Sequence, residues 1–246
     1  MDIEVVMLDF FGTLARATHS IDIGAVVARH GYDLPEHVRE IWWSGDIDGE
    51  EHEAASASRD HYVAWQEERL LAMLAAADVH PGEYEQILAD LHAGRAERVL
   101  EVYDEVPAVL TELRERGVHL AICSNWDWDL DPAIDEVGLA DAVDTVMSSA
   151  WAGARKPHPR IFERTIEQVA GRLGRDVAPA AILFVGDTWG PDVEGPLAAG
   201  MRPVYLERDG HWPDGTLPAG PAPAEVPRAR DLRGVLGLLE SGGDSS

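Results

Sequence analysis

Five short, predominantly apolar runs, separated by segments with helical spacing, most constrain the fold of this chain. The runs are Ile3–Leu8, Val118–Cys123, Val143–Met147, Ile182–Val185 and Pro203–Leu206. A run in which apolar residues follow one another is typical of a strand that is buried on both faces of a sheet. Strands that alternate with helices predict a parallel sheet with right-handed crossovers. We therefore expect an α/β fold with a Rossmann-like, doubly wound core.

Residues 15–100 interrupt this alternation. They contain several stretches with helical periodicity but no convincing strand. A helical segment inserted directly after the first strand predicts a separate cap beside the sheet. We therefore expect a discontinuous core domain, residues 1–14 and 101–246, and a smaller all-helical cap domain, residues 15–100. A stretch rich in Gly and Pro, residues 208–227, predicts a long surface loop, and the tail from residue 241 to residue 246 is expected to be disordered.

The sequence carries a large excess of acidic residues, 45 against 20 basic ones, which gives a formal net charge of −25. Such a surface repels nucleic-acid phosphates and anionic lipid headgroups, so we expect neither nucleic acid nor a membrane as a partner. Cys123 is the only cysteine, which excludes an intrachain disulfide, and the N-terminal residues lack a signal-peptide pattern. We expect a cytoplasmic protein, and its oligomeric state is left open.

Four polar side chains fall at or just after the ends of the predicted strands: Asp9, Ser124, Lys156 and Asp187. In open parallel sheets, ligands bind outside the carboxyl ends of the strands. These four positions therefore predict a functional site at one edge of the sheet.

The same positions carry a family resemblance. The segment Asp9–Leu14 (DFFGTL) resembles the nucleophile motif of the haloacid dehalogenase (HAD) superfamily, in which Gly and Thr follow the reactive Asp. Ser124–Asn125 resembles the second motif of that family, Lys156–Phe162 the third, and Gly186–Asp192 the fourth, the acidic pair. Because all four occur in order, the resemblance covers most of the predicted core. It does not reach residues 15–100.

The resemblance implies a catalytic and a metal-binding role for the acidic residues. Asp9 would be the nucleophile, since a carboxylate can attack phosphorus or carbon and form a covalent intermediate. Asp187 and Asp192, together with Asp9, concentrate negative charge that needs a cation among them. Oxygen ligands select a hard ion, so the expected cofactor is Mg²⁺, held by these carboxylates and the backbone carbonyl of Phe11.

Lys156 and a group of smaller polar residues are expected to bind an anionic small-molecule substrate. Lys156 is the only lysine in the chain. A lysine is a compact point charge, whereas an arginine needs room for its planar fork, so a cramped catalytic site beside Asp9 explains the choice. Ser124 and Asn125 are expected to hold one oxygen of the anion, and the resemblance implies the same for Thr13.

Phe11 departs from the pattern of the family's phosphatases, which have an acid at this position to protonate the leaving group. Phenylalanine cannot donate a proton, and general acid–base help is typically worth about 10²–10⁴ in rate. The family's haloacid dehalogenases have an aromatic residue at this position, and a halide leaves without a proton. Those enzymes, however, lack the acidic pair that Asp187 and Asp192 resemble.

Three functions therefore stay open. Magnesium-dependent hydrolysis of a phosphate monoester is favoured because the metal ligands are present. A 2-haloacid dehalogenase-like reaction at carbon fits Phe11, and a non-catalytic binding protein of the same fold is the third. Three tryptophans on loops at the expected site, Trp126, Trp128 and Trp189, are either packing residues or an aromatic wall for the substrate.

Overall fold

The structure is a computed structural model that describes residues 3–19, 21–43, 50–208 and 226–241. Most of the predicted loop at residues 208–227 and the tail after residue 241 lie outside the described residues. The strands are β1 (Val5–Leu8), β2 (Ala15–His19), β3 (Val99–Val102), β4 (His119–Ser124), β5 (Thr145–Ser148), β6 (Ile182–Gly186), β7 (Arg202–Leu206) and β8 (Arg228–Ala229). The longer helices are α1 (Ile23–Arg29), α2 (Glu36–Trp43), α4 (Arg59–Ala76), α5 (Tyr84–Ala96), α6 (Val106–Glu115), α7 (Leu130–Glu136), α9 (Pro159–Leu173) and α11 (Leu232–Ser241). Shorter ones are α3 (Glu50–Ala55), α8 (Ser149–Ala152), α10 (Gly195–Ala198) and the π-helix η5 (Gly190–Glu194).

The main sheet is parallel and has β1 near its centre. Among the described residues its order is β5-β4-β1-β6-β7-β8. Leu8, at the end of β1, lies beside Ile122 of β4 and Val185 of β6. All four residues of β1 are fully buried, as expected for a strand with sheet neighbours on both sides and helices over both faces. The register brings the carboxyl ends of β1, β4 and β6 to the same edge, where Asp9 and Asp187 follow.

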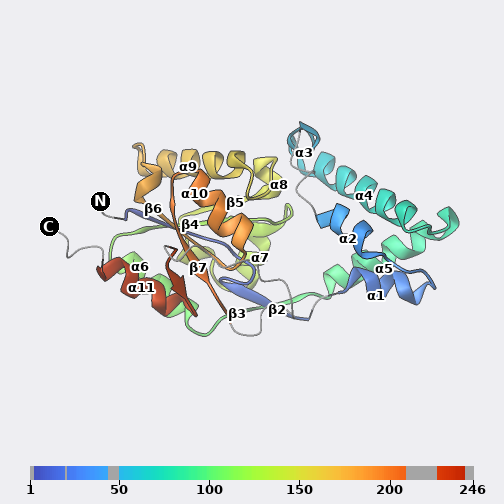
Figure 1. Cartoon of the computed structure of the whole chain (residues 1–246), viewed down its shortest axis with the longest axis horizontal. Coiled ribbons are helices and arrows are strands. Elements are labelled where there is room, and N and C mark those ends of the chain that lie inside the picture. Colours follow the sequence, from blue (N-terminus) through green and yellow to red (C-terminus); the bar gives the residue numbers. More distant parts are fainter. Residues whose placement is uncertain (1–2, 20, 44–49, 209–225, 242–246) are drawn as a thin grey trace. The chain divides into compact units, whose positions relative to one another are not determined.

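Helices cover both faces of this sheet. In Figure 1, α9 and α10 lie over one face, and α6 and α11 lie over the other. The apolar side of α9 packs on β4 and β5 through buried residues such as Ile161, Phe162 and Val169. The five predicted strands are confirmed, with ends that shift by at most two residues. The expected α/β class with a doubly wound parallel core is therefore confirmed.

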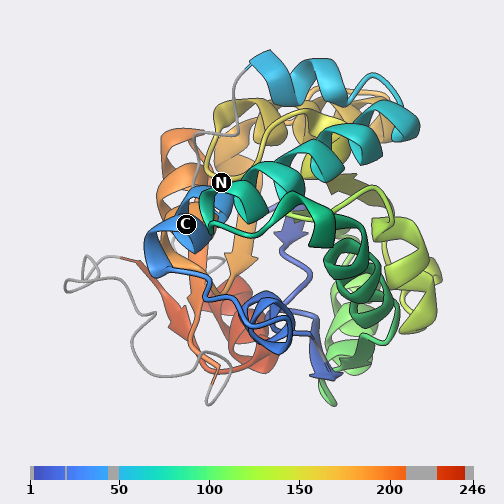
Figure 2. The same ribbon diagram turned by 90° about the vertical axis from the view of Figure 1, so that its right-hand side faces the viewer.

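Residues outside this core form a second compact unit. By its internal contacts the chain divides into Met1–Arg16 with Glu101–Ser246, here called the core unit, and Ala17–Leu100, here called the inserted unit. The sequence placed this division after residues 14 and 100. Within the inserted unit, α4 packs against α2, α3 and α5, and α1 packs against α5 (Figures 1 and 2). Its buried apolar side chains, among them Val27, Leu74 and Ile87, form a core of their own.

The expectation that residues 15–100 contain no strand needs a correction. Strands β2 and β3, at the two ends of this segment, pair as a two-stranded sheet. Most residues of β2 are exposed or half-exposed, and Arg16, Thr18 and His19 are polar. Because such a strand has no continuous apolar run, its sequence does not reveal it. In the part of the chain that the structure describes, no helix has the length and apolar character needed to cross a membrane.

Candidate active site

The site is built on the turn that follows β1. The backbone amide of Asp9 donates to the carbonyl of Val185 on β6 over 2.9 Å, so Asp9 still belongs to the sheet. The turn then closes on itself, because the amide of Leu14 donates to the carbonyl of Phe10 over 2.8 Å. Gly12 lies inside it with a φ of +88°, a conformation that L side chains rarely adopt. The turn holds the Asp9 carboxylate at the carboxyl edge of the sheet, only 5% exposed.

Lys156 lies between two of the acidic residues. Its Nζ donates to Oδ1 of Asp9 over 2.7 Å and to Oδ1 of Asp192 over 2.6 Å. The Lys156 side chain is 2% exposed. Burial by itself lowers the pKa of Lys156, but the carboxylates of Asp192 and Asp9 raise it by more, so the pKa lies above its ordinary value. The ammonium therefore stays charged within the site.

Three buried carboxylates converge at this place. Asp9, Asp187 and Asp192 each offer an oxygen, and these oxygens all lie within 4.8 Å of one another. Asp192 lies on the π-helix η5, where its Oδ2 accepts a hydrogen bond from the Thr188 amide over 2.9 Å. Burial raises the pKa of Asp192, and the Asp9 carboxylate adds to this, although Lys156 opposes it. The carboxylates thus carry more negative charge than one lysine offsets.

A glycine at the end of β6 makes room for this arrangement. A Cβ atom on Gly186 would lie 2.3 Å from Cγ of Asp192 and 2.4 Å from its Oδ2. No side chain is tolerated at such a distance unless Asp192 moves. The approach of Asp192 to the strand end therefore depends on glycine at position 186.

Ser124 and Asn125, at the end of β4, are engaged with the other site residues. The hydroxyl of Ser124 donates to Oδ1 of Asp9 over 2.9 Å. The amide of Asn125 binds the backbone of Lys156 twice, because Nδ2 donates to the Lys156 carbonyl over 3.0 Å and Oδ1 accepts from its amide over 2.6 Å. Asn125 therefore positions Lys156, a role that the sequence did not reveal. Contact of either residue with a substrate stays a prediction.

Thr13 is fully buried in the turn after Asp9. Its hydroxyl has no hydrogen-bond partner among the described residues. A buried hydroxyl without a hydrogen-bond partner costs free energy, so binding of a ligand oxygen that accepts a hydrogen bond from it would be favoured. The predicted role of Thr13 in anion binding is compatible with this, and it stays a prediction.

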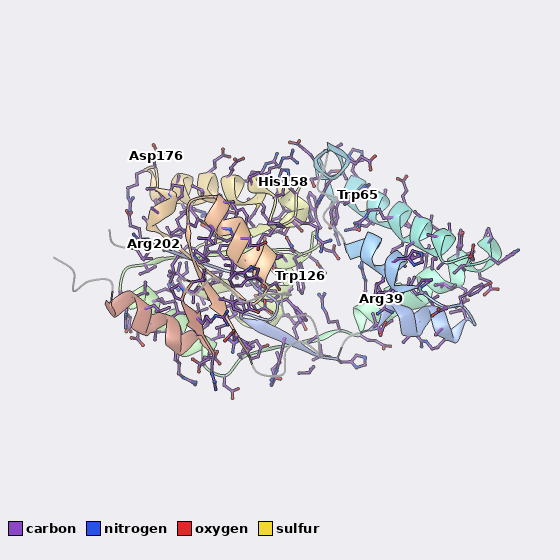
Figure 3. The ribbon with its side chains drawn as sticks, in the orientation of Figure 1. Arg39, Trp65, Trp126, His158, Asp176 and Arg202 are labelled. Carbon is purple, nitrogen blue, oxygen red and sulfur yellow. The ribbon has the colours of Figure 1, made fainter. Side chains whose placement is uncertain are left out.

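An aromatic group borders the turn from Asp9 to Leu14. The rings of Phe10 and Trp126 meet edge to face, with centroids 5.2 Å apart, and the half-buried ring of Phe11 lies 6.1 Å from Trp126. The indole Nε1 of Trp126 donates to Asp129 over 3.0 Å. Figure 3 shows Trp126 on the side of the core where the strands end, far from Asp176. Phe10, Phe11 and Trp126 therefore form one aromatic group at the turn that follows Asp9.

Trp189 has a different environment. It is 9% exposed and packs edge to face on Tyr205, with ring centroids 5.4 Å apart, in a small apolar cluster with Val193. Its Nε1 donates to Glu194 over 3.0 Å. These contacts give Trp189 a packing role, the first of the two roles that the sequence left open, and a contact with substrate stays a prediction.

The sequence also missed a buried pair, Arg208 and Glu105, that is bonded to the turn from Asp9 to Leu14. Arg208 donates to the backbone carbonyl of Thr13 over 2.7 Å and to Glu105 over 2.6 Å. Arg208 stands at the start of a predicted loop, and Glu105 precedes α6 by one residue. No local pattern marks either of them, because their contact spans 103 positions of the chain.

This fold and this site define a class of protein with a parallel α/β core, in which a strand-end aspartate faces a lysine and further carboxylates. The comparisons with known proteins agree. The sequence model of the haloacid dehalogenase-like hydrolases matches residues 3–200 of the chain. The chain therefore belongs to the haloacid dehalogenase-like hydrolase family, as its motifs predicted.

Relatives of both reaction types are similar to the chain. It is 33% identical over 156 residues to haloacid dehalogenase-like hydrolase domain-containing protein 3 of Bos taurus, covering 63% of this chain and 56% of that protein. It is 34% identical over 143 residues to the phosphoserine phosphatase of Thermus thermophilus, covering 58% of this chain and 53% of that enzyme. The chain thus spans about half the length of these two relatives.

A dehalogenase matches over a longer stretch. The chain is 29% identical over 220 residues to the (S)-2-haloacid dehalogenase of a Pseudomonas species, covering 85% of this chain and 84% of that enzyme. The crystal structure of a predicted phosphoglycolate phosphatase from Haemophilus somnus resembles the chain with a TM-score of 0.65 at 18% identity. That alignment covers 97% of this chain and 98% of the other, and it supports the fold alone. Similarity therefore leaves the reaction to be argued from the site.

Proposed function

We propose that this chain is a magnesium-dependent hydrolase of small-molecule phosphate monoesters that works through a covalent intermediate on Asp9. The observation that carries the proposal is the group of three buried carboxylates, with oxygens within 4.8 Å of one another, beside a single buried lysine. Displacement of a halide from carbon needs no metal. An acidic cluster of this kind therefore favours phosphate chemistry.

The residues of the site fit a magnesium ion. Three carboxylates and one ammonium leave two negative charges, which a divalent cation balances. The three carboxylates would offer oxygen atoms as ligands, which suit a hard ion, and the Phe11 carbonyl would add one more ligand oxygen. When bound, Mg²⁺ would offset the charge of the substrate phosphate and polarise its oxygens.

Asp9 would act as the nucleophile. The hydrogen bonds that Ser124 and Lys156 donate to its carboxylate both end on Oδ1. Oδ2 would attack phosphorus, the bond from phosphorus to the leaving oxygen would break, and an aspartyl phosphate would form. Water would then attack phosphorus, releasing inorganic phosphate and restoring the Asp9 carboxylate. Lys156 would stabilise the charge that builds up on the phosphoryl oxygens.

Phe11 restricts the substrates. The leaving oxygen needs a proton when it departs as an alkoxide, and the Phe11 side chain has none to give. A leaving group that is stable as an anion, such as a phenolate, avoids this requirement. We therefore expect aryl or other activated phosphates to be hydrolysed faster than simple alkyl phosphates.

Hydrolysis of a 2-haloacid is the second candidate, and the aromatic pair of Phe11 and Trp126 at the turn that follows Asp9 favours it. In that reaction Asp9 would attack the carbon that bears the halogen, the carbon–halogen bond would break, and halide would leave with the bonding electrons. Water would then hydrolyse the ester and release a 2-hydroxy acid. No metal and no proton donor to the leaving group take part.

A parallel assay separates the two candidates. Phosphate release and halide release are measured on a panel of aryl phosphates, alkyl phosphates and 2-haloacids, with Mg²⁺ and with EDTA. We expect phosphate release that EDTA abolishes and Mg²⁺ restores, and that Asp9→Asn eliminates. Asp176→Asn, an exposed aspartate at the opposite end of the core, is the matched control and should keep full activity. Halide release that persists in EDTA, without phosphate release, would replace the proposal with the second candidate.

A further inference from the structure

A buried arginine lies behind the nucleophile turn, outside the four motifs. The side chains of Arg208 and Glu105 are each 7% exposed and form an ion pair of 2.6 Å. Arg208 follows β7 by two residues, and Glu105 directly precedes α6. The guanidinium also stacks on Tyr103, with its central carbon 3.7 Å from the ring centroid. The group therefore joins the end of β7 to the segment where the chain re-enters the core.

The same guanidinium nitrogen reaches the nucleophile turn. Nη2 of Arg208 donates to the backbone carbonyl of Thr13 over 2.7 Å and to Oε1 of Glu105 over 2.6 Å. Tyr103 is tied to the turn as well, because its amide donates to the Leu14 carbonyl over 3.1 Å. The turn from Asp9 to Leu14 is thus held from outside at Thr13 and at Leu14.

Stability alone does not explain this pair. A buried ion pair contributes little net stability, because the loss of hydration offsets the attraction of the charges, and apolar residues often replace such pairs without loss. A stacked guanidinium supplies a donor in a fixed direction, which an apolar side chain does not. The acceptor for Arg208 is the backbone carbonyl of Thr13. Thr13 lies two residues after Phe11, and the carbonyl of Phe11 is an expected Mg²⁺ ligand.

We propose that Arg208, held by Glu105 and Tyr103, is a positioning residue that sets the placement of the nucleophile turn for the reaction at Asp9. The hydrogen bonds that Arg208 donates to described residues end on the Thr13 carbonyl and on Glu105, so it would act on Asp9 through the carbonyl of Thr13. Without this contact, the turn samples other placements, and Asp9 meets its substrate in a productive geometry less often. The catalytic part of this inference rests on the proposed function, whereas the clamping of the turn does not.

Arg208→Lys is the test, and Arg228→Lys is its matched control. Arg228 also pairs with a glutamate, Glu207, and also lies over a tyrosine ring, that of Tyr205, but its side chain is 42% exposed. Four quantities are measured for each variant: kcat and KM with an aryl phosphate, the melting temperature, and the hydrogen-exchange rate of the peptide that contains residues 10–15. The exchange measurement needs no substrate.

Arg208→Lys should lower kcat by about ten- to hundredfold, the cost of misplacing reacting groups by roughly 1 Å, with KM little changed. Exchange of the 10–15 peptide should become faster, and Arg228→Lys should change neither quantity. Glu105→Gln, which keeps an oxygen acceptor for Arg208, should lower kcat less, and it serves as the test if Arg208→Lys does not fold. If the 10–15 peptide of Arg208→Lys exchanges hydrogen at the wild-type rate, Arg208 does not hold the turn in place, and this outcome needs no substrate. Faster exchange with wild-type kcat would overturn the catalytic role while leaving the proposed function intact.

Discussion

Removal of the charge of Lys156 tests the electrostatic logic of the site most directly. Lys156→Met keeps the length and the apolar stem of the side chain but deletes the ammonium. Nζ lies 2.7 Å from Asp9 and 2.6 Å from Asp192, and the lysine side chain is 2% exposed. In the variant, three buried carboxylates would face one another with neither lysine nor water to offset their charge.

The size of the effect follows from this geometry. Removing one partner of a buried ion pair costs about 3–5 kcal/mol, because the remaining charge is left uncompensated. For a chain of this size, 1 kcal/mol shifts the melting temperature by about 2–4 °C. The metal-free variant should therefore melt roughly 6–20 °C below the wild type. The assay is thermal unfolding in EDTA, followed by far-UV circular dichroism.

Mg²⁺ should reverse much of this loss. A ligand at a hundred times its Kd stabilises the folded state by about 2.7 kcal/mol. Because the ammonium no longer competes for the carboxylates, the variant should bind Mg²⁺ more tightly and gain more in melting temperature than the wild type. Catalysis should stay impaired, and Lys156→Arg should lower kcat/KM nearly as much as Lys156→Ala, since a planar fork does not fit this space. A Lys156→Met variant as stable as the wild type in EDTA would refute the reasoning.

Three further predictions follow from other residues. Phe11→Asp supplies a proton donor and should raise kcat/KM for alkyl phosphates relative to aryl phosphates, by a factor of at most about 10²–10⁴. A wild type that already cleaves alkyl and aryl phosphates equally well would show that another group gives the proton. Gly186→Ala should lower Mg²⁺ affinity by about 10–100-fold in calorimetry, because the new methyl would displace Asp192, and unchanged affinity would contradict this. Burial lowers the pKa of His119, even though Asp144 opposes this, so the folded state binds its proton less readily than the unfolded state. The stability that the lowered pKa of His119 contributes is present above about pH 6.5 and is lost as the pH falls through the pKa of the folded state. His119→Asn removes this titration, so the melting temperature of the variant should fall less between about pH 7 and 5 than that of the wild type.

Local patterns in the sequence predicted the sheet and the placement of Asp9 at its edge. The apolar run before Asp9 predicts a buried strand, and parallel strands end at one edge, so Asp9, Ser124 and Asp187 were expected to meet there. These inferences succeed because burial on both faces of a strand leaves a mark on successive residues. Strands β2 and β3 were missed because half-exposed strands leave no such mark.

What only the tertiary structure decided is which groups are partners. Lys156 bonds Asp9 across 147 positions of the chain, and Arg208 bonds Thr13 across 195. The amide of Asn125 is taken up by the backbone of Lys156, and the ring of Trp189 packs on Tyr205. Each of these contacts depends on where distant segments come to lie and on how much water the packing excludes. The residue types at strand ends therefore indicated the family and the place of the site, whereas their burial and pairing depended on the assembled fold.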